Sequence, residues 1–154
     1  MQGRLTPPSN ERIQFFPWSN WKNEFKLASN KIDLIEWTID DFNINKNPIF
    51  FEEQTILSLS KKYKISIESV TCDFLMENPF YKNEKTKINS FYYLEKLIDI
   101  SKDLMIKYLV FPLVDNGSIK SEEQENKLLK KLSKIEKKLT NNINILFESD
   151  NGPK

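Results

Sequence analysis

Short apolar runs alternate with longer amphipathic segments along most of the chain, and this alternation constrains the fold more than any other feature. Five runs are typical of strands, and the segments between them have helical spacing. The predicted strands are residues 3–5, 34–37, 65–70, 108–114 and 143–148. Alternating strands and helices favour a parallel α/β sheet over a segregated α+β fold. We therefore predict an α/β fold with five parallel strands and four intervening helices.

The predicted helices each place apolar residues on one face. The first begins near Ser19 or Asn20, both good N-cap residues. The spacing from Ser121 to Gln124, at the start of the fourth, is that of a capping box. The expected inward residues are Trp21, Phe25 and Ala28 in the first helix; Ile56, Leu59 and Tyr63 in the second, over residues 52–63; Leu94, Leu97, Ile98, Ser101 and Met105 in the third, over residues 88–106; and Leu128, Leu132, Ile135 and Leu139 in the fourth.

The length of the chain limits how much of a larger fold it contains. Eight βα units close a TIM barrel of about 250 residues, with the active site at the carboxyl ends of the strands. Because the chain has 154 residues, the five predicted units indicate an incomplete (β/α)8 TIM barrel in a single domain over residues 1–154. Pro112 lacks an N–H, so we expect the sheet ladder to loosen near the end of the fourth strand.

Charge, cysteine content and hydropathy exclude several classes of protein. The 23 lysines and arginines nearly balance the 22 acidic residues, which argues against a nucleic-acid partner. The sequence contains no run of about 18 apolar residues that could cross a membrane. The single cysteine, Cys72, cannot form an internal disulfide. We therefore expect a cytoplasmic protein.

Acidic residues gather where the predicted strands end. An acidic residue in a βα loop is by itself more often a helix cap or a solvated turn. Because parallel strands end at one edge of the sheet, the group together predicts an acidic mouth suited to a divalent metal and a polyol. The residues are Glu36, Asp40 and Asp41 at the second strand, Asp73 after the third, Asp115 after the fourth, and Glu148 and Asp150 at the fifth.

Cysteine and tryptophan residues near this mouth have simpler explanations. The chain contains no histidine to activate Cys72 as a nucleophile, so we expect a buried or pocket-lining thiol. Trp18, Trp21 and Trp37 lie near one loop region. They could form a stacking platform for a sugar ring, but packing in the core and loops is the favoured role.

Six short blocks carry a resemblance that covers nearly the whole chain in order. They are MQGRLTPP at residues 1–8, RIQFFPW at 12–18, IEW at 35–37, SVTCD at 69–73, VFPLVD at 110–115 and LFESD at 146–150. Together they resemble the sugar phosphate isomerase/epimerase family, which are TIM barrels of the xylose isomerase-like group. The block at the amino terminus is the most specific one.

The resemblance implies a chemistry and a set of site residues. It implies a divalent metal, commonly manganese, magnesium, cobalt or zinc, and a proton moved between adjacent carbons of a sugar or sugar phosphate through an enediol. Glu148 matches the glutamate that acts as metal ligand and as catalytic acid/base. Gln2, Arg4, Glu36 and Asp73 match positions expected to contact substrate or support the site. For Arg4, a buried ion pair with Glu36 or with a neighbouring acidic residue at a strand end is an equal alternative.

The chain also departs from the family pattern. The other metal ligands of the family come from strands six to eight, and this sequence contains no histidine. We therefore expect a truncated isomerase or epimerase that is inactive alone. The alternative is a non-enzymatic half-barrel, an assembly module completed by a second chain. Apolar residues of an open sheet predict self-association or pairing with a complementary C-terminal half-barrel; the candidates are Val110, Leu113, Ile145 and Phe147.

Overall fold

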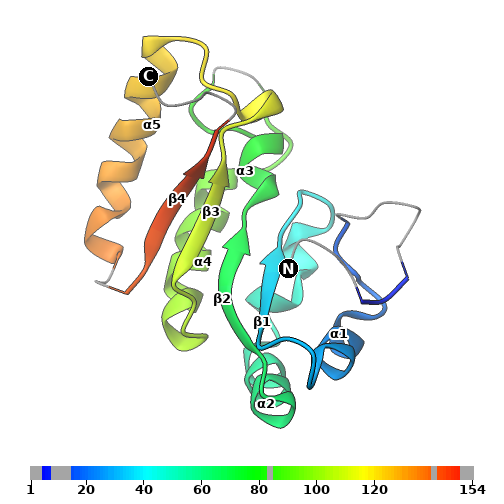
Figure 1. Cartoon of the computed structure of the whole chain (residues 1–154). Helices are drawn as coiled ribbons and strands as arrows, with labels where there is room; N and C mark the ends of the chain where they lie inside the picture. Colours follow the sequence, from blue (N-terminus) through cyan, green and yellow to red (C-terminus); the bar gives the residue numbers. More distant parts are fainter. Residues whose placement is uncertain (1–4, 8–14, 83–84, 140–141, 150–154) are drawn as a thin grey trace.

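A single parallel sheet forms the centre of the protein (Figure 1). The computed structural model describes residues 5–7, 15–82, 85–139 and 142–149. Its strands, in the sheet order β1-β2-β3-β4, are β1 Leu34–Thr38, β2 Ser66–Thr71, β3 Tyr108–Pro112 and β4 Asn144–Glu148. All neighbours are parallel, which confirms the α/β class and the sequential order.

The first predicted strand is not among these four. Residues 3 and 4 lie outside the described residues, and Leu5 lies in a bend rather than a strand. The described part of the chain therefore contains four strands in place of the expected five. The fifth strand and the TIM barrel stay predictions.

The described residues form five α-helices, one more than expected. Four of them match the predicted helices: α1 Trp21–Ala28, α2 Glu53–Tyr63, α4 Ser90–Asp103 and α5 Glu122–Ile135. The additional helix, α3 Asp73–Glu77, directly follows β2. Four short 3-10 helices complete the described elements: η1 Ile44–Lys46, η2 Pro48–Phe50, η3 Asp115–Gly117 and η4 Glu136–Lys138.

The inward faces of the helices follow the predicted spacing with one exception. Trp21, Phe25 and Ala28 are buried in α1, and Leu94, Leu97, Ile98 and Ser101 are buried in α4. Met105, however, is 73% exposed. Because α4 ends at Asp103, Met105 lies outside the helix and has a φ of 58°. The prediction that it faces inward was wrong.

One face of the sheet packs against helices and the other is open. Trp37 pairs with Val70, and Val70 pairs with Leu109; all three are buried. Figure 1 shows α4 behind the strands, α2 below the lower ends of β1 and β2, and no described segment in front of β2, β3 and β4. The core therefore lies between the sheet and the helices. On the other face Leu146, which pairs with Val110, remains 45% exposed.

Pro112 ends β3 at a position where its missing N–H is harmless. Leu113 N donates to Glu148 O, and Cys72 N donates to Val110 O. By the alternation of a strand, the nitrogen of Pro112 is on the side of β2. Since β2 ends at Thr71, little of the ladder is lost. Strand β3 ends two residues before the predicted Val114, but its pairing with β4 continues regularly to Pro112 and Glu148, so the ladder does not loosen on that side.

Two loop contacts fix the carboxyl-end region. Tyr81 Oη donates to the Gly117 carbonyl, and Asn116 Nδ2 donates to Glu77 O at 3.3 Å. A Cβ on Gly117 would lie 2.6 Å from Pro112 O and 3.1 Å from Met76 Cα. Only glycine therefore fits this approach without a backbone shift, and the loop after β3 is held against α3.

Candidate functional site

Glu36 and Glu148 lie on the open face of the sheet, on opposite edge strands of the described sheet. The register pairs Thr38 with Thr71 and Pro112 with Glu148, and side chains two apart share a face. Glu36 is half-buried and accepts a hydrogen bond from Thr71 Oγ1, whereas Glu148 is exposed. Three strand spacings separate β1 from β4, on the order of 14 Å along the sheet. The two carboxylates therefore come from strands that are not neighbours in the sheet.

Asp73 lies between them and interacts electrostatically with both. It is the first residue of α3, separated from the end of β2 by Cys72 alone, and it is half-buried. Burial, followed by the negative charges of Asp40, Glu148 and Glu36, raises the pKa of Asp73 to about 6. A carboxyl group with such a pKa exchanges its proton near neutral pH. Asp73 is therefore the described residue of this region best suited to carry a proton.

Glu77 is a second carboxyl group with a raised pKa at this end of the sheet. Burial, with the charges of Asp41, Asp40 and Asp73, raises the pKa of Glu77 to about 7, against the lowering effect of the hydrogen bond from Asp41 N. That bond is 2.6 Å long. Because Glu77 is an exposed residue, water screens its carboxylate more than that of Asp73. Asp73 is the stronger candidate.

Backbone N–H groups hold Asp40, and an asparagine and a lysine side chain hold Asp41. Asp40 is buried and accepts from Phe16 N at 3.4 Å and from Phe42 N at 3.2 Å. Asp41 accepts from Asn78 Nδ2 at 3.1 Å and pairs with Lys87 at 3.2 Å. The mouth is therefore acidic, as expected, but its carboxylates have definite structural partners.

An aromatic group borders the carboxylates. The rings of Phe15 and Trp18 lie 5.0 Å and 6.3 Å from that of Phe42, which is 49% exposed. The indole nitrogen of Trp18 is buried without a hydrogen-bond partner. Trp21 and Trp37 are buried and pack 5.6 Å apart, so the packing role predicted for them is confirmed. Trp18 and Phe42 are the rings placed at the margin of the site.

Of the remaining predicted residues, some lie outside the described ranges, one is exposed and one is buried. Gln2, Arg4 and Asp150 lie outside the described residues. Asp115 is the exposed first residue of η3. The next residue, Asn116, donates a hydrogen bond to the backbone of α3. Cys72 is fully buried, and burial, with the charge of Asp73, raises the pKa of its thiol far above the usual value. The expectation of a buried thiol is confirmed.

The described residues do not form a metal centre by themselves. Within those ranges, no three histidine, cysteine, aspartate or glutamate side chains are grouped so that they could hold a metal ion. This agrees with the separation of Glu36 from Glu148. The implied manganese, magnesium, cobalt or zinc therefore does not fit these residues without further ligands.

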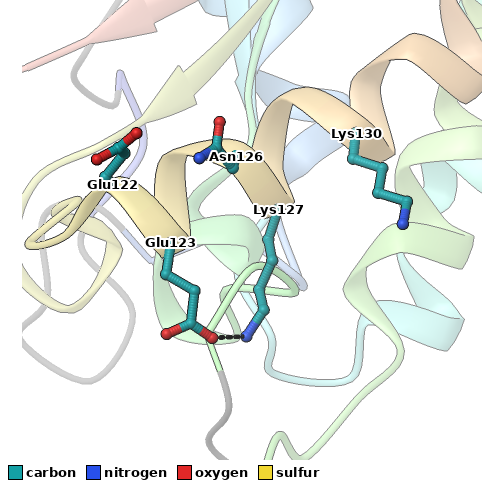
Figure 2. Close-up of a pocket in the computed structure, with 5 residues that line it drawn as sticks. All are labelled: Glu122, Glu123, Asn126, Lys127 and Lys130. Atoms are coloured by element: carbon teal, nitrogen blue, oxygen red, sulfur yellow. Dashed lines mark hydrogen bonds and ion pairs between the residues drawn. The ribbon is translucent and has the colours of Figure 1, made fainter.

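A hollow elsewhere on the surface has a different character. Five residues of α5 line it: Glu122, Glu123, Asn126, Lys127 and Lys130. Figure 2 shows Glu123 and Lys127 turned toward one another, and their ion pair is 2.6 Å long. Because a single helix supplies every lining residue, this is the solvated face of a helix and not a binding cleft.

Comparisons with known proteins add no family to these observations. No protein-family model matches the chain, and no curated protein matches it. No helix in the described ranges has the length and apolar character needed to cross a membrane.

Replacing Asp73 should make stability less dependent on pH. The folded-state pKa of Asp73, about 6, lies above its ordinary value of 3.8, so its ionisation costs stability as the pH rises through this window. We expect Asp73→Asn to be more stable than the original chain by about 1–2 kcal/mol at about pH 7.5 and to lose that advantage near pH 4.

Urea denaturation at both pH values measures this difference. Asp33→Asn, at an exposed residue ahead of β1, is the matched control and should change little at either pH. An advantage of Asp73→Asn that is the same at both pH values would contradict the raised pKa.

Proposed function

We propose that the chain is part of a metal-dependent sugar or sugar phosphate isomerase or epimerase, built on an incomplete TIM barrel of the xylose isomerase-like kind. The observation that carries the proposal is the half-buried carboxyl of Asp73. Its pKa is raised to about 6 by burial and by the negative charges of three other carboxylates, which belong to Asp40, Glu148 and Glu36. The motif resemblance supplies the reaction class.

The proposed reaction moves a proton between adjacent sugar carbons through an enediol. Such chemistry needs a carboxylate that can accept and return a proton near neutral pH. In the proposal Glu148 is the acid/base that the motif resemblance implies. Asp73 and Glu36 bind substrate hydroxyl groups, and Asp73, whose pKa is raised to about 6, exchanges its proton with the bound hydroxyl group. Thr71 holds the Glu36 carboxylate by a hydrogen bond, which keeps it fixed on the open face. In the proposal the aromatic rings of Trp18 and Phe42, whose centroids lie 6.3 Å apart, pack against the apolar side of a sugar ring.

In this proposal a divalent metal binds only when residues outside the described ranges supply further ligands. When bound, it would polarise the sugar carbonyl as a Lewis acid. Glu148 would be one ligand, and the others would come from strands absent from the described residues. Gln2 and Arg4 remain proposed substrate contacts. A cytoplasmic location, in which a lone cysteine stays reduced, is part of the same proposal.

Binding of sugars to the isolated chain tests the substrate half of this proposal. Titration with aldoses, ketoses and their phosphates, followed by amide NMR shifts, should give dissociation constants on the order of 1–10 mM. We expect the shifts to concentrate at the carboxyl ends of β1, β2 and β4. Asp73→Asn should weaken binding at least several-fold, whereas Asp33→Asn should not.

The result that would overturn the proposal is equally specific. Absence of saturable shifts with every sugar, or shifts confined to the surface of α5, would remove the sugar site. The non-enzymatic alternative, a half-barrel assembly module, would then be favoured, because the open sheet face and exposed β4 are independent of any ligand.

A further inference from the structure

Strand β4 is an exposed edge with apolar side chains on both faces. Leu146 on the open face is 45% exposed, and Phe147 on the helix side is 49% exposed. Of the five residues of β4, four are exposed and one is intermediate. Among the described residues, β3 is the neighbour of β4 and no strand covers its other edge.

Two backbone hydrogen bonds determine which groups of β4 face outward. Asn144 N donates to Lys107 O at 2.8 Å, and Glu148 O accepts from Leu113 N at 2.7 Å. Residues 144, 146 and 148 therefore direct their backbone groups toward β3. The N–H and C=O groups of Ile145 and Phe147 consequently point away from the sheet, where they are available to another strand.

The sequence of β4 is complementary to its own antiparallel copy. With Leu146 opposite Leu146 of a second copy, Ile145 lies opposite Phe147 and Asn144 lies opposite Glu148. The outward groups of Ile145 and Phe147 then face each other, so each such pair exchanges both of its hydrogen bonds. Apolar residues meet apolar residues in the centre, and an amide meets a carboxylate at each end. The direction of the outward backbone groups and the pattern of side chains thus select the same antiparallel register, with Leu146 opposite Leu146.

Strand β4 lacks most of the features that protect natural edge strands, and its one charged residue, Glu148, lies at its end. Natural edge strands are commonly protected by lysine, proline or a β-bulge. Residues 144–148 contain no lysine and no proline, and the pairing of β4 with β3 is regular. The pairing of β1 with β2 at the opposite edge is interrupted by a register shift between Leu34 and Glu36. The two edges therefore differ, which favours pairing of β4 with itself over pairing of β4 with β1.

We propose that β4 is a homodimerisation edge at which two copies of this chain join their sheets through antiparallel β4 strands, with Leu146 at the two-fold axis. The short strand limits the buried area, so the dimer is weak, with a dissociation constant on the order of 10–100 µM. This inference does not rest on the proposed enzymatic function. A complementary half-barrel would compete for the same edge.

A disulfide trap tests the register directly. Directly opposed residues of a non-hydrogen-bonded antiparallel pair have Cα atoms about 4.5 Å apart, which a disulfide can bridge. Leu146→Cys, oxidised with diamide at about 100 µM protein, should form a covalent dimer on a non-reducing gel. Cys72 is buried and does not interfere. Leu34→Cys is the matched control on β1, since Leu34 is 49% exposed, and it should stay monomeric.

Sedimentation provides a second, independent measurement. The original chain and Leu34→Lys should show the same concentration-dependent dimer, whereas Leu146→Lys should remain a monomer up to about 1 mM. Circular dichroism establishes that each variant is folded. If Leu146→Lys fails to fold, the cysteine trap decides alone.

Three outcomes would overturn the proposal. The first is that the chain remains a monomer up to about 1 mM. Association with an added complementary half-barrel, without any homodimer, counts as the same outcome. The second is Leu34→Lys dissociating the dimer as well as Leu146→Lys, which indicates head-to-tail pairing of β1 with β4. The third is Leu146→Cys cross-linking no better than Leu34→Cys.

Discussion

The isolated chain should show no measurable isomerisation of aldoses or ketoses when manganese, cobalt or magnesium is added. The reason lies in the residues available: the sequence has no histidine, and no three ligand-type side chains are grouped in the described ranges. Exchange of the sugar C2 hydrogen in deuterated buffer, followed by NMR, is a sensitive measurement of this chemistry. Turnover that Glu148→Gln abolishes would contradict the expectation and would mean that self-association completes a site.

The role of Glu148 itself is best tested in a completed barrel. In a barrel reconstituted with a complementary half that supplies strands six to eight, Glu148→Gln should lower kcat by about 10²–10⁴-fold, the usual contribution of a general acid/base. Glu125→Gln, at an exposed position on α5, is the control and should retain full activity. Equal activity of Glu148→Gln and the control would remove Glu148 from the catalytic role.

Loss of the Glu24 carboxylate should cause the largest loss of stability among the single substitutions considered. Glu24 is buried on α1 and accepts from Leu5 N at 2.9 Å, from Thr6 N at 3.1 Å and from Thr6 Oγ1. Glu24→Ala removes a charged acceptor and leaves these donors without it. We expect a loss of about 2–4 kcal/mol in the free energy of unfolding.

Urea denaturation with matched variants measures this effect. Glu24→Gln keeps one acceptor oxygen and nearly the same volume, so it should lose less than Glu24→Ala. Glu125→Ala, at an exposed glutamate of α5, should change stability by less than about 0.5 kcal/mol. A Glu24→Ala variant as stable as the Glu125→Ala control would show that residues 5 and 6 are not anchored by this carboxylate.

Periodicity predicted the long elements because burial of one face determines them. The stripes of α1 and α4 are examples, and all four described strands lie within two residues of the predicted ends. Met105 was misplaced because the helical spacing continues in the sequence after α4 has ended. Helix α3 was missed because its five residues are too few for a recognisable period. Local pattern therefore predicts elements better than it predicts where they end.

The candidate site was predicted in outline only. Because parallel strands end at one edge of the sheet, the sequence placed Glu36, Asp73 and Glu148 together. In the structure the charges of Glu36 and Glu148 do act on Asp73. This prediction gave no indication of Glu77, because that residue lies on the unpredicted helix α3. Nor could sequence show that Asp73 is half-buried and has a raised pKa, since both depend on side chains far apart in the chain.

The sequential strand order has a consequence for synthesis of the protein. Each strand pairs with the one before it in the chain, and the helix between them returns to the same sheet. A nascent chain can therefore add one βα unit at a time, without waiting for a distant segment to be translated. At every stage of this growth the newest strand is the exposed edge, and β4 is the last described strand to occupy that position.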